Sequence, residues 1–329
     1  MDRMLPRPRF WAETALQMKT RLTIFGELLV FVLLYFIGSM VQSMVLSVPM
    51  SLWMLSSQGG SMLAALEAGA SPQDLVLKLM ENMPDWLAVV GLYGSAGLGA
   101  AALIYGLRFQ KRKLSAMGLA RDGAAGEYLL GLGVGLALFT GALAVGAALG
   151  GFHPVRGLAR DGQPLLCLAT LLGCLIQGAS RELLIRGCFA PSVGARVPVP
   201  YALLMSTLIS GMLETGGALL SMRTVNGLLL GLLLGIWAIK RGRIWSACAI
   251  HGVWSFAGSF LFGFAPAGEH GGIRLLDVDV DAYRPMLTGG LYGPQASICV
   301  TVVLLAALAG SLALKPRDPL PEQPEPGRA

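Results

Sequence analysis

Charged residues are scarce in this sequence. Only 13% of its 329 residues are Asp, Glu, Lys or Arg, whereas 54% are hydrophobic. Soluble domains carry about 25% charged residues, so a water-facing surface cannot be assembled from this composition. The scarcity excludes an ordinary soluble domain and indicates a protein that is embedded in a membrane.

Histidine and cysteine are few, with three and five residues. No cysteine takes part in a CxxC motif or a Cys/His ligand spacing, so we expect no disulfide framework and no structural metal centre. The net charge is +6, but no basic stripe with interleaved aromatic residues is present. We therefore expect no nucleic-acid partner.

Long apolar segments, in contrast, are abundant. A membrane-spanning helix needs about 20 apolar residues, and the first segment is too long for a signal-peptide core. Together the segments predict an all-α, polytopic membrane helix bundle of about eight transmembrane helices, with the lipid bilayer as its main partner. The eight candidates are residues 25–50, 84–107, 126–150, 164–186, 200–220, 224–240, 244–264 and 291–314.

Lys and Arg cluster before the first of these segments and after every second one, whereas acidic residues collect in the loops between. Basic loops stay in the cytoplasm. This alternation predicts that both termini are cytoplasmic in a multi-pass protein, which we expect in a bacterial cytoplasmic membrane. The basic residues are Lys19, Arg21, Arg108, Lys111, Arg112, Lys113, Arg186, Arg196, Lys240, Arg241, Arg243, Lys315 and Arg317.

The chain divides into three parts by composition. Residues 1–24 form a basic N-terminal segment, 25–314 the membrane domain, and 315–329 a tail rich in proline and charge that we expect to be disordered. Within the membrane domain, Gly227, Gly231 and Gly235 recur every fourth residue. This spacing predicts a smooth ridge on which another helix packs closely.

Five of the ionisable residues within or at the end of the apolar segments are informative. They are Arg181, Glu182, Arg186, Glu214 and His251. Charges in a bilayer are costly and face a partner or a cavity, so we expect a polar centre between the fourth, fifth and seventh segments. Glu182 and Arg186 are four residues apart and share a helix face. Arg181 and Glu214 are candidates for a salt bridge between helices.

The segment RELLIRG at residues 181–187 resembles the first motif of the CAAX-protease and bacteriocin-processing (CPBP, Abi) membrane proteins, which reads Glu-Glu-x-x-x-Arg-Gly. Residues 226–256 are similar to the region of the third motif, and residues 111–119 and 287–297 to further stretches of these proteins. The resemblance covers roughly 108–314. It implies an eight-helix intramembrane protease in which a glutamate of the first motif activates water and histidines of the later motifs assist.

Several motif positions are replaced in this chain. Aligned with the family, Glu182, Arg186 and His251 are retained. The positions of the first glutamate, the second-motif histidine and the third-motif Asn or Asp hold Arg181, Leu213 and Ser255. An arginine stays protonated and cannot act as a general base, and leucine offers no lone pair.

These replacements argue against ordinary proteolysis. A metal site needs about three protein ligands, and only Glu182, His251 and Glu214 could serve as ligands here. Glu214 is one residue along the helix from the second-motif position, which rotates it by about 100°. We therefore expect no cofactor, although a divalent metal at Glu182 and His251 is conceivable.

The leading interpretation is a catalytically degenerate member that acts as a membrane scaffold or regulator, with a membrane protein or peptide as partner. One alternative is an active peptidase that uses Glu182 and His251 in a rearranged site. Another is a transporter or small-molecule bundle, which would need a discontinuous helix; Gly216-Gly217 is the candidate break.

Overall fold

The computed structural model describes residues 5–18, 22–58, 83–153, 164–214, 221–262 and 278–317, with Glu67, Gly69, Ser71 and Leu276 and without Ala282. Lys19 and Arg21, most of the two acidic loops, the pair Gly216-Gly217 and the tail from residue 318 lie outside the described residues. What was predicted for them remains a prediction.

The fold is an all-α bundle, as expected, and within the described residues five helices are long and apolar enough to cross a membrane. Several of them continue through a short π-helical turn or bend without ending. The five are α2 (Ile24–Trp53) with η1 (Met54–Gln58), α5 (Asp85–Gly94) with α6 (Ala96–Ile104) and η2 (Tyr105–Phe109), α7 (Ala124–Ala148), α8 (Pro164–Glu182) with η4 (Leu183–Phe189) and α9 (Ala190–Gly194), and α11 (Met222–Arg241).

Three further predicted spans are also helical, and the last two of them are shorter than expected. The three are α10 (Val199–Glu214), α12 (Trp245–Phe256) with η5 (Ala257–Leu261), and α14 (Ile298–Ala313). Residues 215–220, the predicted end of the first, lie outside the described residues. The last span was predicted to begin at residue 291. Gly293, with φ of 66°, and Pro294 interrupt the helix there, and the hydroxyl of Ser297 caps α14 by accepting from the Val300 amide at 3.2 Å.

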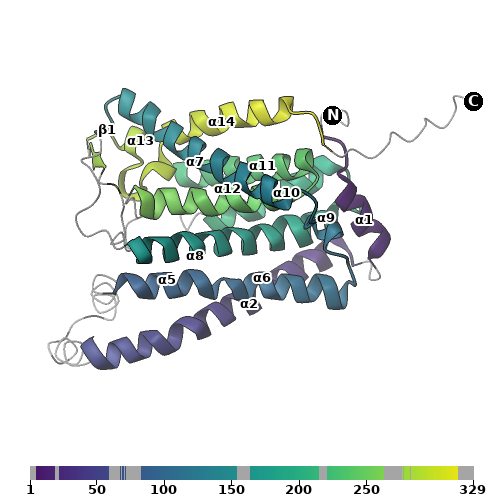
Figure 1. The fold of residues 1–329 in the computed structure, drawn as a ribbon, viewed down its shortest axis with the longest axis horizontal. Helices are drawn as coiled ribbons and strands as arrows, with labels where there is room; N and C mark the ends of the chain where they lie inside the picture. Colours follow the sequence, from purple (N-terminus) through teal and green to yellow (C-terminus); the bar gives the residue numbers. More distant parts are fainter. Residues whose placement is uncertain are drawn as a thin grey trace, which may run out of the picture.

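The helices pack in successive layers (Figure 1). α2 lies against α5 and α6, these lie against α8, and α12 follows between α8 and α7. α11 then packs between α10 and α14. α12 is the centre of the bundle, since all of its residues except Trp245 and Ser255 are buried.

Glycines allow the central helices to approach one another. A Cβ atom on Gly178 of α8 would lie 2.5 Å from the backbone nitrogen of Gly252 in α12, so neither helix could hold this position with a larger residue. The predicted ridge on α11 is confirmed. Its three glycines face Glu214, Ser210 and Leu203 of α10, in the order Gly227, Gly231, Gly235.

One end of the bundle is closed by the N-terminal helix α1 (Arg9–Gln17), which packs on α9 and on the short turn η3 (Ser115–Met117). Phe10 and Trp11 are buried, and Thr14 donates to the carbonyl of Ala116 at 2.7 Å. The indole of Trp11 lies where a side chain of Gly194 would be. The N-terminal segment is thus docked on the bundle.

The C-terminal end of α14 reaches the same end of the bundle as α1 (Figure 1). Lys240 donates to the carbonyls of Leu312 and Leu314 at 3.0 and 2.9 Å, and Arg317 and Arg241 both pair with Glu127 at the start of α7. The opposite end carries a short antiparallel pair, β1 (Phe152–His153) with β2 (Asp279–Val280), and α13 (Pro285–Thr288). Basic residues far apart in the sequence are therefore gathered at one end.

Candidate functional site

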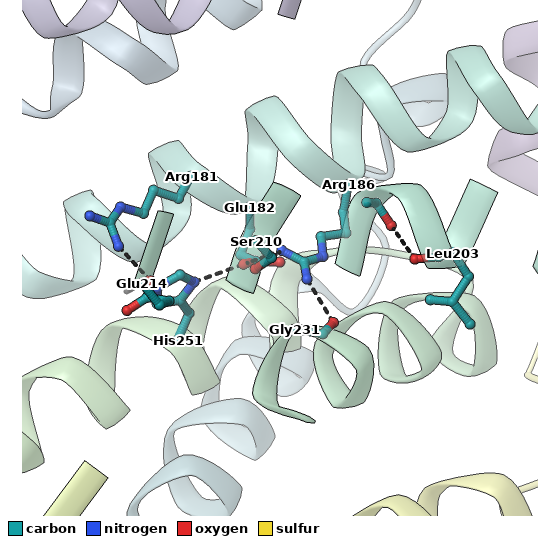
Figure 2. A network of polar contacts seen from close by, with 9 residues as sticks. Arg181, Glu182, Arg186, Leu203, Ser210, Glu214, Gly231 and His251 are labelled. Carbon is teal, nitrogen blue, oxygen red and sulfur yellow. Dashed lines mark hydrogen bonds and ion pairs between the residues drawn. The ribbon is translucent and has the colours of Figure 1, made fainter. Parts of the chain in front are cut away.

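The five intramembrane ionisable residues meet in one place, between α8, α10 and α12 (Figure 2). Arg181 and Glu182 are the last two residues of α8, and Arg186 lies in the π turn η4 that follows directly. Glu214 ends α10, and His251 lies in the middle of the buried helix α12. π turns inside helices occur frequently at functional sites, and this one begins at the residue after Glu182.

Glu182 is the centre of the cluster. Its Oε1 lies 2.7 Å from Nδ1 of His251 and accepts from Nη1 of Arg186 at 2.9 Å. The side chain of Glu182 is fully buried, and those of Arg186 and His251 are 2% and 3% exposed. The predicted pair of residues four apart is therefore formed, and it is closed off from both water and lipid.

Arg186 is held by two further groups. Nη1 donates to the Ser210 hydroxyl at 3.2 Å, and Nη2 donates to the carbonyl of Gly231 at 2.7 Å. The guanidinium thus lies between the Ser210 hydroxyl of α10 and the Gly231 carbonyl of α11 (Figure 2). The retained motif arginine thus ties the polar centre to α10 and α11.

The proposed pairing of Arg181 with Glu214 is confirmed, because Nη1 of Arg181 lies 2.5 Å from Oε1 of Glu214. The same oxygen lies 3.3 Å from Nε2 of His251. Glu214 therefore lies on the opposite side of the imidazole from Glu182. Arg181 and Glu214 are partly exposed, at 23% and 21%, so the cluster reaches the surface at this end only.

The two remaining replaced positions lie outside the network. Leu213 packs against the apolar core, and Ser255 is half-buried on α12. Among the described contacts, neither residue bonds to a member of the cluster. The positions of the second-motif histidine and of the third-motif Asn or Asp thus contribute no polar group to this cluster.

The arrangement is a row in which basic and acidic side chains alternate, in the order Arg181, Glu214, His251, Glu182, Arg186. Each carboxylate already faces one guanidinium and one imidazole nitrogen. Oε2 of Glu182 is the exception, since it is buried and accepts no hydrogen bond. It is the one oxygen of this glutamate with a lone pair left for a further donor.

The residues do not fit a metal ion. Across the parts of the chain that the structure describes, no three His, Cys, Asp or Glu side chains are placed to hold one. The two carboxylates that come closest each lie beside an arginine, whose charge repels a cation where a ligand set must attract it.

Sequence reasoning missed a second set of polar residues, which lies near the basic end. Glu27 and Glu127 lie in the first turns of α2 and α7 and are buried, although both helices were treated as plain apolar spans. Glu27 pairs with Arg196 at 3.1 Å. A signal was present, because an acidic residue in the first turn of an apolar segment needs a cationic partner at the same depth.

Comparison with known proteins gives one match. Residues 163–257 match the family model described as Type II CAAX prenyl endopeptidase Rce1-like. This range includes all five residues of the polar cluster. A comparison with curated proteins and one with solved structures each found no significant match. The resemblance drawn from the motifs is thereby confirmed over residues 163–257, which are similar to the CPBP-type CAAX prenyl endopeptidases.

Proposed function

We propose that this protein is a catalytically inactive relative of the CAAX-type intramembrane endopeptidases, which acts in the membrane as a scaffold or regulator. The observation that carries the proposal is the pairing of Arg181 with Glu214 beside His251. Arg181 stands where the family has a glutamate that can act as a base, and the carboxylate of Glu214 neutralises its charge.

Hydrolysis needs a group that takes a proton from water at the point of attack. Arg181 occupies the position of the first motif glutamate and stays protonated. Glu182 shares its Oε1 between Arg186 and His251 and is fully buried. The polar centre is therefore better suited to hold α8, α10 and α12 together than to activate water.

A second candidate is an active peptidase with a rearranged site, and one contact favours it. Glu182 and His251 form a carboxylate–imidazole pair at 2.7 Å, and Oε2 of Glu182 has no hydrogen-bond partner. A water bound to Oε2 could pass a proton to the Glu182 carboxylate, which would then act as the general base. In this candidate the remaining catalytic role falls to His251 Nε2, which would have to leave Glu214.

A cleavage assay distinguishes the two candidates. Purified protein is incubated with prenylated and unmodified CAAX-type peptides, beside an active CAAX prenyl endopeptidase as positive control. We expect no product above background from the wild type, Glu182→Gln or His251→Ala. Processing by the wild type that Glu182→Gln abolishes, while the variant keeps its thermal stability, would establish the peptidase and overturn the scaffold.

We further propose that the basic end of the bundle, with α1 and the C-terminal end of α14, lies on the cytoplasmic side of a bacterial cytoplasmic membrane. The gathering of Arg112, Arg196, Lys240, Arg241 and Arg317 at this end supports the orientation. A partner in the form of a membrane protein or peptide, and function without a cofactor, complete the proposal.

A further inference from the structure

A small pocket lies beside the polar cluster and is lined by Glu214. It has room for about one water molecule and is partly open to the outside. Glu214 comes from the end of α10 and Trp254 from α12, whereas Gln295 comes from the short turn η7 (Pro294–Ala296). The start of α11 contributes Arg223, Asn226 and Gly227. Segments that are distant in the sequence therefore build one polar pocket.

The turn that carries Gln295 is held in place by Asn226. The side-chain amide of Asn226 donates to the carbonyls of Gln295 and Ser297, both at 2.9 Å, and its Oδ1 accepts from the Thr301 hydroxyl at 2.7 Å. Gln295 belongs to the stretch 287–297 that resembles the CAAX-protease family, and these bonds fix the position of that stretch against α11. The wall of the pocket is therefore a defined part of the fold.

Two polar side chains of this wall have no partner. Trp254 is 4% exposed, and its indole N–H donates to no group among the described contacts. The side-chain amide of Gln295 likewise makes no hydrogen bond there. Buried polar groups in proteins nearly always have hydrogen-bond partners, and a buried indole N–H usually finds an acceptor. The pocket thus presents a donor that calls for a ligand.

Glu214 offers the matching acceptor. Its Oε1 faces Nη1 of Arg181 at 2.5 Å and Nε2 of His251 at 3.3 Å (Figure 2). Among the described contacts, its second oxygen, Oε2, accepts no hydrogen bond, so this carboxylate has lone pairs left for a further donor. A ligand in the pocket can therefore accept from the indole and donate to the carboxylate.

The charges of the wall select a neutral ligand. Glu214 repels an anion and Arg223 repels a cation, so a monatomic ion of either sign meets a like charge. A water molecule carries no charge and is both a donor and an acceptor. Its size matches the room in the pocket, and a buried water typically has two to four polar partners.

We propose that this pocket binds one ordered water molecule, which donates to the Glu214 carboxylate and accepts from the Trp254 indole, with the Gln295 amide as third partner. The water connects Glu214, and through it His251, with the outside of the bundle. Glu182 lies on the other side of the imidazole, so the water is held by a carboxylate that is not a motif residue. This binding site does not rest on the proposed function, since an inactive protein and a peptidase would both contain it.

Hydroxyl-radical footprinting of the full chain in lipid nanodiscs tests the proposal. A brief X-ray exposure splits water where it is bound, and the radicals oxidise the side chains in contact with it, which mass spectrometry quantifies. Trp254 and Trp11 are a matched pair within the chain, because both are buried, at 4% and 3% exposed, and only Trp254 lines this pocket. We expect Trp254 to be oxidised at least fivefold faster than Trp11.

A pair of variants locates the water. Gly227→Ala adds a methyl group at the pocket wall, 3.1 Å from the Cβ atom of Glu214, and this group takes the space of the water. Gly231→Ala is the matched control, because its methyl group lies one turn further along α11, 3.0 Å from the Cβ atom of Ser210 and outside the pocket. We expect Gly227→Ala to lower the oxidation rate of Trp254 at least fivefold, and Gly231→Ala to leave it unchanged.

Each other outcome overturns the proposal. Equal oxidation of Trp254 and Trp11 in the wild type would show that no water is bound beside Trp254. A fast rate that Gly227→Ala leaves unchanged would place the water elsewhere, and an equal loss in Gly231→Ala would show that helix packing controls the rate. If Gly227→Ala does not fold, Gln295→Leu decides alone, because it removes the amide from the wall at similar volume. An unchanged rate in Gln295→Leu would then reject the site.

Discussion

Nδ1 of His251 lies 2.7 Å from Oε1 of Glu182, and both side chains are buried at the centre of the bundle. The same oxygen neutralises Arg186. The retained motif residues therefore depend on one another, so replacing one of them changes stability as well as any chemistry. Activity measurements on this site must be read beside the free energy of unfolding.

Removal of the Glu182 carboxylate should destabilise the protein strongly. Glu182→Ala leaves the Arg186 guanidinium buried without a counter-charge, and breaking a buried pair in this way costs about 3–5 kcal/mol. The double variant Glu182→Met/Arg186→Met should recover most of that loss, because an apolar pair of similar volume removes both charges. Unfolding in mixed detergent micelles measures the difference. If the double variant were less stable than Glu182→Ala, the pair would not be a buried ion pair of this kind.

The Arg181–Glu214 pair should show a smaller, separable coupling. Both side chains are partly exposed, so we expect an interaction energy of about 0.5–3 kcal/mol from a double-mutant cycle with Arg181→Ala and Glu214→Ala. The exchange Arg181→Glu/Glu214→Arg should be more stable than Arg181→Glu alone, in which two carboxylates face His251. Additive effects in the cycle would contradict the pairing.

Close packing of α8 on α12 predicts a large effect from one methyl group. Gly178→Ala places a Cβ atom 2.5 Å from the backbone of Gly252, so the helices must separate, at a cost of about 1–3 kcal/mol. Gly133→Ala on α7 is the matched control, since no neighbouring helix or side chain lies within 4 Å of its Cβ position. It should be neutral or stabilise the protein by up to about 1 kcal/mol, through the higher helix propensity of alanine. Equal thermal shifts for the two variants would refute the tight contact.

The orientation can be tested by labelling introduced cysteines with a membrane-impermeant maleimide. Leu16→Cys and Tyr283→Cys lie at opposite ends of the bundle, and the native side chains are 87% and 95% exposed. The five native cysteines are all buried and should stay unlabelled. In intact spheroplasts we expect labelling of Tyr283→Cys alone, and labelling of Leu16→Cys only after permeabilisation. The reverse pattern would invert the topology.

Much of the fold follows from hydrophobicity. Apolar length located all eight helical segments, and the four-residue spacing of glycines located the α10–α11 contact. Local backbone effects changed the ends. Gly293 and Pro294 shorten the last span, and α2 extends to Trp53 because its residues remain helix-compatible beyond the predicted end at residue 50.

The site was predictable only where charge dictates a partner. An ionised side chain inside a membrane span costs free energy unless it has a partner, so an arginine and a glutamate in neighbouring spans made the Arg181–Glu214 pair predictable. The position of Glu214 against His251 was not, since it depends on how far α10 slides along α11 over the glycine ridge. The buried contacts of Glu27 and Arg112 were not predicted, because their partners lie on segments whose depth the sequence does not reveal.

The contact of Trp11 with Gly194 makes the docking of α1 depend on a helix that is synthesised much later. Chains are made from the N-terminus, and segments fold as their partners become available. α1 precedes the spans in the chain, but the surface of α9 on which it packs is complete only after four spans have been synthesised. During synthesis the buried face of α1, with Phe10 and Trp11, therefore has no partner until Gly194 has been made, so this helix docks only after α9 although it precedes α9 in the chain by four spans.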